Sequence, residues 1–401
     1  MNERMYGLGS KRSVIRETFE YGKRRAAEVG AENVYDFSLG NPSVQPPAVV
    51  AETLQKLLQS EDATALHGYT SAQGDASVRR AIADYISSSQ GVPADPDRIY
   101  MTCGAAASLT ITLSALCSAG DEVITFKPYF TEYKVFAETA GARLVALPSV
   151  PDTFQIDLSA LERAIGPRTA AVLINSPNNP SGAVYGEETI RGLAAILTAR
   201  SEELGRTIYL VTDEPYRELV YGGVQVPYVT KYYPHSVVCY SYSKSLSLPG
   251  ERIGYIFVNP AAAEAEKLYL AVCGAGRALG YVCAPSLFQK LVARCQGVTA
   301  DVSAYEKNRD LLAGALRAYG FSCVQPDGAF YLFVKAPGGD AAAFCEQAKA
   351  FDLLLVPGDD FGCEGYVRIA YCVSHAMIER SLPAFAKLAR ACGLAAGTNK
   401  E

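Results

Sequence analysis

TAAVLIN (169–175) and TIYLVTD (207–213) are two strand-length runs that are apolar along most of their length. Such runs are typical of parallel strands, because helices cover both faces of a parallel sheet. The stretch between them carries apolar residues at the spacing of one helix face, namely Ile190, Leu193, Ile196 and Leu197. The three segments together predict a β-α-β unit, since two neighbouring parallel strands need a long crossover connection.

The same alternation extends in both directions from this unit. Further strand-length runs are IYMTC (99–103), EVITF (122–126), RLVAL (143–147), SVVCYS (236–241) and IGYIFV (253–258). Apolar stripes at helical spacing lie among them, at Leu109, Leu113 and Leu116 and again at Leu158, Leu161 and Ile165. This order predicts an α/β fold with a mostly parallel central sheet and helices on both of its faces.

The last third of the chain has a different, α+β pattern. Its expected helices and strands follow one another at 305–319, 328–334, 341–350, 353–357, 366–371 and 377–391. We expect residues 46–290 to form a large domain. The small α+β domain is then formed by residues 1–45, which precede the sheet, together with residues 291–401. The tail GTNKE (397–401) is expected to be frayed.

Composition excludes several classes of function. The chain has 401 residues, with 37 Lys and Arg against 42 Asp and Glu, and a formal net charge of −5. This mildly acidic balance argues against a nucleic-acid partner, which needs clustered cations. The three histidines, His67, His235 and His375, are too few for a multi-histidine metal site or a histidine-based triad. We therefore expect no metal site.

The cysteines and the apolar segments indicate the cellular compartment of the protein. There are 11 cysteines, without a C-x-x-C pair, and we interpret them as reduced packing residues. The first eleven residues carry charges but no apolar signal stretch. No run approaches the roughly 18 apolar residues of a membrane helix. We therefore expect a cytoplasmic protein with no membrane partner.

Residues that can contact a ligand follow five of the expected strands. They are Gly104-Ala105-Ala106 after 99–103, Phe130 after 122–126, Asn179 after 169–175, Asp213 with Tyr216 after 207–213, and Ser243 with Lys244 after 236–241. Taken singly, each has an ordinary reading as a turn, a helix cap or a solvated charge. The carboxyl ends of parallel strands meet at one edge of a sheet, where ligands bind. Together these residue types fit an anionic, aromatic, aldehyde-bearing cofactor.

The run SYSKSLSLPGERIGY (241–255) resembles the cofactor-lysine segment of class I/II aminotransferases, whose pattern is S-x-x-K followed by G-x-R-x-G-Y. These are enzymes of fold type I that use pyridoxal 5'-phosphate. The resemblance covers essentially the whole chain in family order, through LGNPS (39–43), GYTSAQG (68–74), KPYFTEY (127–133), SPNNPSG (176–182), DEPY (213–216), PDGAFY (326–331), VPGDDFG (356–362) and YVRIAY (366–371).

The resemblance implies roles at the reactive end of the cofactor. Lys244 matches the lysine that binds the cofactor aldehyde covalently and then moves the substrate α-proton. Asp213 matches the carboxylate that keeps the ring nitrogen protonated, so that the ring accepts electrons. Tyr216 and Asn179 match the two groups that hydrogen-bond to the 3-oxygen of the ring. Phe130 lies where the family places an aromatic over the ring face.

The resemblance also implies the groups around the phosphate. They are the turn at Gly104, the N–H groups of Ala105 and Ala106, the hydroxyls of Ser241 and Ser243, and Arg252. Relatives offer a hydroxyl where this chain has the Ala-Ala pair. Tyr69 matches a tyrosine that reaches the phosphate in the neighbouring subunit, which implies a homodimer with shared active sites. The Asn179-Pro180 bond is a candidate cis peptide.

Arg368, within YVRIAY, matches the arginine that grips the substrate α-carboxylate, for which a planar guanidinium is well suited. The backbone of Gly40 and the side chain of Asn179 complete this clamp in the resemblance. The amino donor and acceptor stay open. So does the question of whether Arg277, Arg12 or Arg16 reaches the substrate.

The predicted function is that of an aminotransferase of amino-acid metabolism and biosynthesis. It moves an amino group from an amino acid to a 2-oxo acid in ping-pong order. The alternative is a carbon–sulfur (β-elimination) lyase or another enzyme of fold type I, because the same pocket supports several bond cleavages. A non-catalytic sensor is disfavoured by the intact Lys244 and Arg368. A nicotinamide dehydrogenase is disfavoured because the first strand-to-helix turn lacks its glycine fingerprint.

Overall fold

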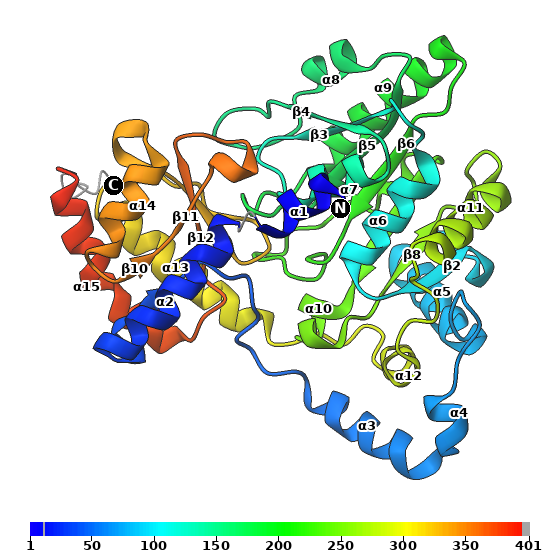
Figure 1. Cartoon of the computed structure of the whole chain (residues 1–401), viewed down its shortest axis with the longest axis horizontal. Helices are drawn as coiled ribbons and strands as arrows, with labels where there is room; N and C mark the ends of the chain where they lie inside the picture. The colour runs from blue at the N-terminus through cyan, green and yellow to red at the C-terminus, as the bar shows by residue number, and fades with distance from the viewer. Residues whose placement is uncertain (11–12, 395–401) are drawn as a thin grey trace.

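The computed structural model describes residues 1–10 and 13–394 (Figure 1). Its central sheet has the strand order β2-β8-β7-β6-β5-β3-β4. The strands are β2 (Ile99–Thr102), β3 (Glu122–Phe126), β4 (Arg143–Leu147), β5 (Thr169–Asn175), β6 (Tyr209–Asp213), β7 (Ser236–Ser241) and β8 (Gly254–Val258). Only β8 runs antiparallel to its neighbours, β2 and β7. The predicted mostly parallel sheet is therefore confirmed.

Helices cover both faces of this sheet. One face packs against α5 (Ala76–Gln90), α9 (Glu187–Leu204) and α12 (Ser286–Arg294), and the other against α6 (Ala105–Leu116), α7 (Glu132–Thr139) and α11 (Ala265–Ala278). Alternate residues of β5 divide between the two faces, since successive side chains of a strand point to opposite sides. Val172 joins the α9 side, whereas Leu173 joins the α6 side. Burial on both faces explains the continuous apolar strand sequences.

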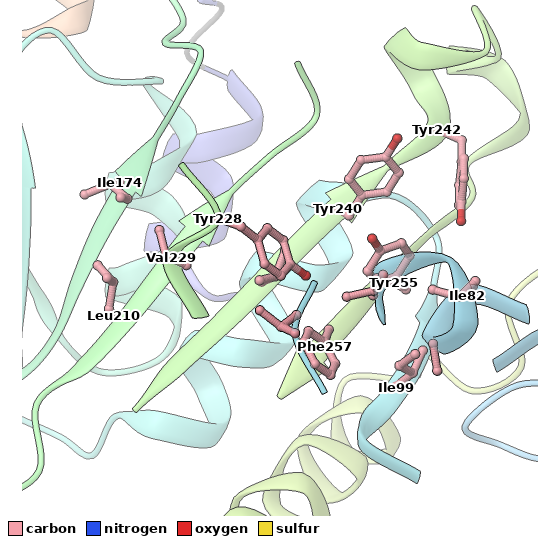
Figure 2. Close-up of a cluster of buried hydrophobic side chains, with 14 of the residues drawn as sticks. Ile82, Ile99, Ile174, Leu210, Tyr228, Val229, Tyr240, Tyr242, Tyr255 and Phe257 are labelled. Carbon is pink, nitrogen blue, oxygen red and sulfur yellow. The ribbon is translucent and has the colours of Figure 1, made fainter. Parts of the chain in front are cut away.

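The first of these faces carries the largest apolar cluster, part of which is drawn in Figure 2. Ile174 and Leu210 lie at one end of it, on β5 and β6, and Ile82 of α5 lies at the other. Several tyrosines pack within it, among them Tyr228, Tyr240, Tyr242 and Tyr255. Their hydroxyl groups bring polar atoms into an otherwise apolar layer.

A second sheet has the order β11-β12-β9, with β12 (Tyr366–Ala370) antiparallel to both β11 (Val356–Pro357) and β9 (Tyr331–Lys335). It packs with α13 (Val302–Ala318), α14 (Ala341–Lys349) and α15 (His375–Ala391) around a core that includes Leu312, Phe385 and Leu388. The short strand β1 (Tyr35–Asp36) pairs in parallel with β10 (Leu353–Leu354). In Figure 1 the blue helix α2 (Val14–Val29) accordingly lies among the orange and red C-terminal elements.

Further helices and turns connect these layers. The α-helices are α1 (Glu3–Ser10), α3 (Ala48–Ser60), α4 (Ala63–His67), α8 (Leu158–Ala164) and α10 (Tyr242–Ser245). Turns of 3₁₀-helix are formed by Ala31–Asn33, Pro96–Arg98, Val229–Lys231, Pro249–Glu251, Pro337–Gly339 and Asp359–Phe361. Within the described residues, no helix is long and apolar enough to cross a membrane.

Two C-terminal strands differ from the sequence prediction. The run 328–334 becomes extended only from Tyr331, because Gly328 and Ala329 instead bond to Gly182 and Leu219 of the large sheet's loops. The run 353–357 is divided into β10 and β11, since its two halves pair with β1 and β12 in different sheets. The boundaries at 45/46 and 290/291 stay a prediction. The tail GTNKE lies outside the described residues, as does Arg12.

Candidate active site

A cavity of about 310 Å³ lies at the carboxyl ends of β5, β6 and β7. Its size is within the range of small-molecule sites. The predicted site residues that line it are Gly40, Ala105, Ala106, Phe130, Asn179, Asp213, Tyr216, Ser241, Ser243, Lys244, Arg252 and Arg368. The structure thus brings together residues of the large sheet, the loop after β1 and strand β12.

Lys244 lies in the short helix α10, directly after β7. Its Nζ donates a hydrogen bond to the carbonyl of Gly40 at 2.7 Å. Burial, with smaller contributions from the nearby guanidinium groups of Arg252 and Arg368, lowers the pKa of Lys244 to about 8. A lysine with such a pKa is partly neutral near neutral pH, which is the state in which an amine attacks an aldehyde.

Asp213 is the last residue of β6 and is buried. Its Oδ2 accepts a hydrogen bond from the hydroxyl of Tyr133 at 2.6 Å, while its Oδ1 is buried with no partner among the described residues. Burial raises the pKa of Asp213 to about 7, against the lowering effect of the Tyr133 hydrogen bond. An unpartnered carboxylate oxygen at the cavity wall fits the protonated ring nitrogen of a pyridoxal cofactor.

Asn179 is fixed by the loop that follows β5. Its backbone N–H donates to Asn175 Oδ1 at 2.7 Å, and the amide of Asn175 in turn donates to the carbonyl of Asp213 at 2.8 Å. The Asn179-Pro180 bond is cis, as predicted, and Lys127-Pro128 and Ser176-Pro177 are cis as well. The two hydrogen bonds of the Asn175 side chain tie the 176–182 loop to the end of β6.

Tyr216 is the second residue expected at the 3-oxygen of the ring. Its hydroxyl lies 2.9 Å from that of Tyr331, which also lines the cavity. The same Tyr331 hydroxyl lies where any side chain at Gly40 would be, since an added Cβ would approach it to 2.1 Å. Residue 40 therefore has to be glycine for the Tyr216–Tyr331 pair to keep its place.

Arg368 lies in the middle of β12 and is only 2% exposed. Its Nη1 donates to Asn179 Oδ1 at 3.2 Å, and its Nη2 donates to the carbonyl of Ser38 at 2.5 Å. Within the described residues it has no carboxylate partner, and its Nε is unpartnered. Burial lowers its pKa. A buried guanidinium without a counter-charge at a cavity wall is well placed to bind a carboxylate from a ligand.

The segment before the cavity is held by three side chains in succession. The carbonyl of Ser38 accepts from Arg368, that of Leu39 from the thiol of Cys372 at 3.5 Å, and that of Gly40 from Lys244. These three bonds fix the backbone up to Gly40, the residue of this segment that lines the cavity. Two of the three donors, Arg368 and Lys244, are cationic residues that line the cavity.

The opposite end of the cavity is suited to an anion. Helix α6 begins at Ala105, and no described side chain caps its first turn. Its free N–H groups and its dipole therefore face the cavity. The hydroxyls of Ser241 and Ser243 lie 2.8 Å apart at this end. Gly104 has a φ of +85°, and an added Cβ there would come within 2.8 Å of Arg252 Nη2, so glycine lets the arginine approach the turn.

Four predicted or candidate residues do not line the cavity. Gly104 lies just outside it and contributes through its backbone. Tyr69 is 98% exposed in this single chain. Arg16 and Arg277 are exposed, so their contact with a substrate is not formed within one chain.

The comparison with known proteins decides the family. A family model described as aminotransferase class I and II matches residues 31–385. The chain belongs to the class I and II aminotransferases. Members of this family use pyridoxal phosphate. The aminotransferase therefore moves an amino group from an amino acid to a 2-oxo acid, and the alternative of a lyase is not supported.

Relatives match the aminotransferase over most of its length. It is 30% identical to a probable aspartate/prephenate aminotransferase of Thermus aquaticus, over 87% of this chain and 89% of that protein. It is also 30% identical to an aspartate aminotransferase of Thermotoga maritima, over 90% of this chain and 93% of that protein. A crystal structure of an amino transferase from Eubacterium rectale has a TM-score of 0.96 and 59% identity, covering 98% of both chains.

Sequence reasoning missed several residues around the cavity of the aminotransferase. The missed lining residues are Ile15, Leu109, Asn175, Pro215, Pro249 and Tyr331. Tyr133, the partner of Asp213, was quoted within KPYFTEY but given no role. Tyr133 lies in the first turn of α7, three residues after the predicted Phe130, and the two rings pack edge to face with their centroids 5.7 Å apart. This closeness in the chain to a predicted residue is the signal that could have found it. No local signal marks Ile15, which comes from helix α2.

Proposed function

We propose that this aminotransferase binds pyridoxal 5'-phosphate in the cavity and is attached to it through Lys244. The observation that carries the proposal is the pairing, in one cavity, of a lysine whose pKa is lowered to about 8 with a buried carboxyl that has an unpartnered oxygen. When bound, the cofactor supplies an aldehyde that reacts with amines and a ring that accepts an electron pair.

The residues of the chain divide the remaining work. Asp213 keeps the ring nitrogen protonated, and Tyr133 in turn holds Asp213 through its hydroxyl. Tyr216 and Asn179 hydrogen-bond to the 3-oxygen, and Phe130 covers one face of the ring. The uncapped N–H groups of Ala105 and Ala106, with Ser241, Ser243 and Arg252, bind the phosphate.

Lys244 also carries the proton that transamination has to move. As a neutral amine it takes the α-proton of the substrate, and as an ammonium it returns a proton at the neighbouring carbon. Arg368, helped by Asn179 and the backbone of Gly40, holds the substrate α-carboxylate and so fixes where the α-proton points. The two half-reactions use the same groups in opposite directions, which gives ping-pong order.

We also infer a homodimer with shared sites. The support is Tyr69, which is 98% exposed here although the family resemblance places it at a phosphate. The large domain is inferred to comprise residues 46–290 and the small domain residues 1–45 and 291–401. This division is supported by separate apolar cores around the two sheets. A cytoplasmic location and a role in amino-acid biosynthesis belong to the same proposal.

The charge of the amino donor decides how many cations the site has to supply. The relatives named above include aspartate and aspartate/prephenate aminotransferases. The two arginines that line the cavity are Arg368 and Arg252, of which Arg252 serves the phosphate end. A dicarboxylic donor therefore requires a further cation, for which Arg16 and Arg277 of a second copy are the candidates. A monocarboxylic donor requires none.

The test is a panel of amino donors and 2-oxo acid acceptors with single-turnover absorption spectra of the purified holoenzyme. Transamination predicts one equivalent of 2-oxo acid per cofactor without acceptor and steady turnover with it. Steady release of ammonia without acceptor would contradict it. Borohydride reduction followed by peptide mass spectrometry should place the cofactor on Lys244. Lys244→Ala should abolish this attachment, whereas Lys134→Ala, at an exposed lysine, should not.

A further inference from the structure

A second, smaller cavity lies behind the Lys244 turn. It has a volume of about 30 Å³ and lies between α5, the ends of β7 and β8 and the segment 295–299. Ser245 lines this cavity, whereas Ser243 and Lys244 line the larger one. Helix α10 is therefore the wall between the two cavities. Figure 2 shows Tyr240, Tyr242 and Tyr255 close together in this part of the core.

Two polar atoms at this cavity are buried and have no partner among the described residues. They are Glu218 Oε2 and the hydroxyl of Tyr228, and both residues line the cavity. The neighbouring Arg217 does not pair with Glu218, because its guanidinium is used by Glu214 and by the carbonyls of Val226 and Pro227. About 30 Å³ holds one or two water molecules, and a buried water needs polar partners of this kind.

The other oxygen of Glu218 begins a hydrogen-bonded chain that ends beside Lys244. The hydroxyl of Tyr240 lies 2.9 Å from Glu218 Oε1 and 2.9 Å from Ser245 Oγ. The carbonyl of Ser245 accepts from the N–H of Ala300 at 2.7 Å, which fixes the far end of the turn. A phenol has a single hydrogen, so Tyr240 donates to one of its two neighbours and accepts from the other.

The direction of this chain depends on the proton of Glu218. When the carboxyl is ionised it only accepts, so Tyr240 donates to Glu218 and Ser245 donates to Tyr240. When Glu218 takes a proton from water, its O–H can donate to Tyr240, which then donates to Ser245. The two states place opposite hydrogen-bond dipoles directly behind the Lys244 turn.

We propose that Glu218, with enclosed water, is a positioning residue for Lys244 that acts through Tyr240 and Ser245. The proposal rests on the proposed role of Lys244 as the cofactor lysine. Burial, reinforced by the charge of Glu214, raises the pKa of Glu218 to about 7, while the Tyr240 hydrogen bond and Arg217 lower it. Its proton therefore exchanges near neutral pH. The titratable and charged groups that face this site are Glu214, Arg217, Tyr85, Tyr228, Tyr240, Tyr242, Tyr255 and Cys295.

The test compares Glu218→Gln and Tyr240→Phe in the holoenzyme with a matched control, Tyr233→Phe. Tyr233 belongs to the same apolar cluster, but its hydroxyl donates to Ile208 and lines neither cavity. We expect kcat to fall about 3- to 10-fold in the first two variants, the worth of one hydrogen bond, with KM within about twofold of the wild type. The kcat profile of Glu218→Gln should lose the component that titrates with Glu218 near pH 7, and the pH titration of the visible cofactor band should shift.

Wild-type profiles and spectra in both Glu218→Gln and Tyr240→Phe would overturn the proposal, as would an equal effect of Tyr233→Phe. If Glu218→Gln does not fold, Tyr240→Phe still breaks the chain and decides. A crystal structure of the holoenzyme should show water within hydrogen-bonding distance of Glu218 Oε2 and Tyr228 Oη. An empty cavity or a metal ion there would contradict the inference that water occupies it. Borohydride labelling of Lys244 separates the outcomes, because a wild type without lysine-bound cofactor fails the proposed function rather than this inference.

Discussion

Asp213 ends strand β6 and Glu218 lies in the turn that follows it, and the two residues line the two cavities on either side of the Lys244 turn. Each has one buried carboxyl oxygen without a partner among the described residues, and burial raises the pKa of each to about 7. They differ in the space beside them, which is about 310 Å³ at Asp213 and about 30 Å³ at Glu218. The same chemical signature thus indicates an organic ligand at the first and water at the second. A raised pKa identifies a site only when it is read together with the space in front of it.

Asp213→Asn tests most directly whether the carboxyl beside the larger cavity serves an organic ligand. Asparagine keeps the size of the side chain but cannot stabilise a protonated ring nitrogen by its charge. We expect kcat/KM to fall on the order of 10²- to 10³-fold, as for other preorganised electrostatic groups, while cofactor remains bound to the folded protein. Steady-state kinetics and the visible spectrum measure the two quantities. An unchanged kcat/KM would mean that the unpartnered oxygen does not serve the ring.

The next largest effect is expected at Arg368. Arg368→Ala removes charged hydrogen bonds to the substrate carboxylate, so KM for the amino donor should rise roughly 10- to 100-fold. Cofactor affinity should change little, because Arg368 is not among the groups proposed to bind the phosphate. Arg368→Lys retains the charge but loses the planar fork, and an intermediate KM is expected. A KM equal to that of the wild type in Arg368→Ala would remove the carboxylate clamp from the proposal.

Tyr133→Phe probes the support of Asp213 rather than Asp213 itself. Burial raises the pKa of Asp213, and the Tyr133 hydrogen bond opposes that shift. Loss of the bond should therefore raise the pKa further, and the ionised form should be lost at a higher pH. The acid limb of the kcat/KM profile is expected to move upward by up to about one pH unit. A shift toward lower pH has the wrong sign for this arrangement.

The smallest effect concerns stability at the second cavity. The pKa of Glu218 is raised from 4.5 to about 7 in the folded state, so its contribution to stability is present below pH 4.5 and is lost as the pH rises through 7. Glu218→Gln cannot titrate. Its melting temperature should therefore fall less between pH 5 and 8 than that of the wild type, by a few degrees or roughly 1–3 kcal/mol. Parallel curves for the two proteins would show that Glu218 does not titrate in this range.

Strand runs and motifs predicted most of the fold and most of the cavity. The central strands are apolar on both faces and so are marked locally, as TAAVLIN shows for β5. The residues of the C-terminal run 353–357 predict one strand, because nothing in them shows that Leu354 and Val356 pair with different sheets. Pairing partners distant in the chain decide such boundaries, and a local pattern does not contain them.

The same limit applies to the site. Lys244 and Asp213 were found because each lies beside a strand end within a recognisable motif. Tyr331 and Ile15 line the same cavity from β9 and α2, and their place depends on how the two sheets meet. Glu218 was missed for a further reason, since a glutamate in a loop is ordinarily exposed to solvent. Glu218 differs from an ordinary loop glutamate only in its surroundings. It lines a small cavity, and the neighbouring Arg217 is already paired with Glu214.

The backbone carbonyls of residues 38–40 compete with any ligand for the hydrogen-bond donors of the site. Arg368 Nη2 and Lys244 Nζ donate to the carbonyls of Ser38 and Gly40, so a ligand that takes either of these two donor atoms displaces a backbone acceptor. The measured affinity of such a ligand is therefore the difference between two interactions, not the strength of one. A ligand that binds these donors more weakly than the carbonyls do leaves residues 38–40 in place. The hydrogen bonds of this segment therefore set the minimum affinity that a ligand needs to occupy the site.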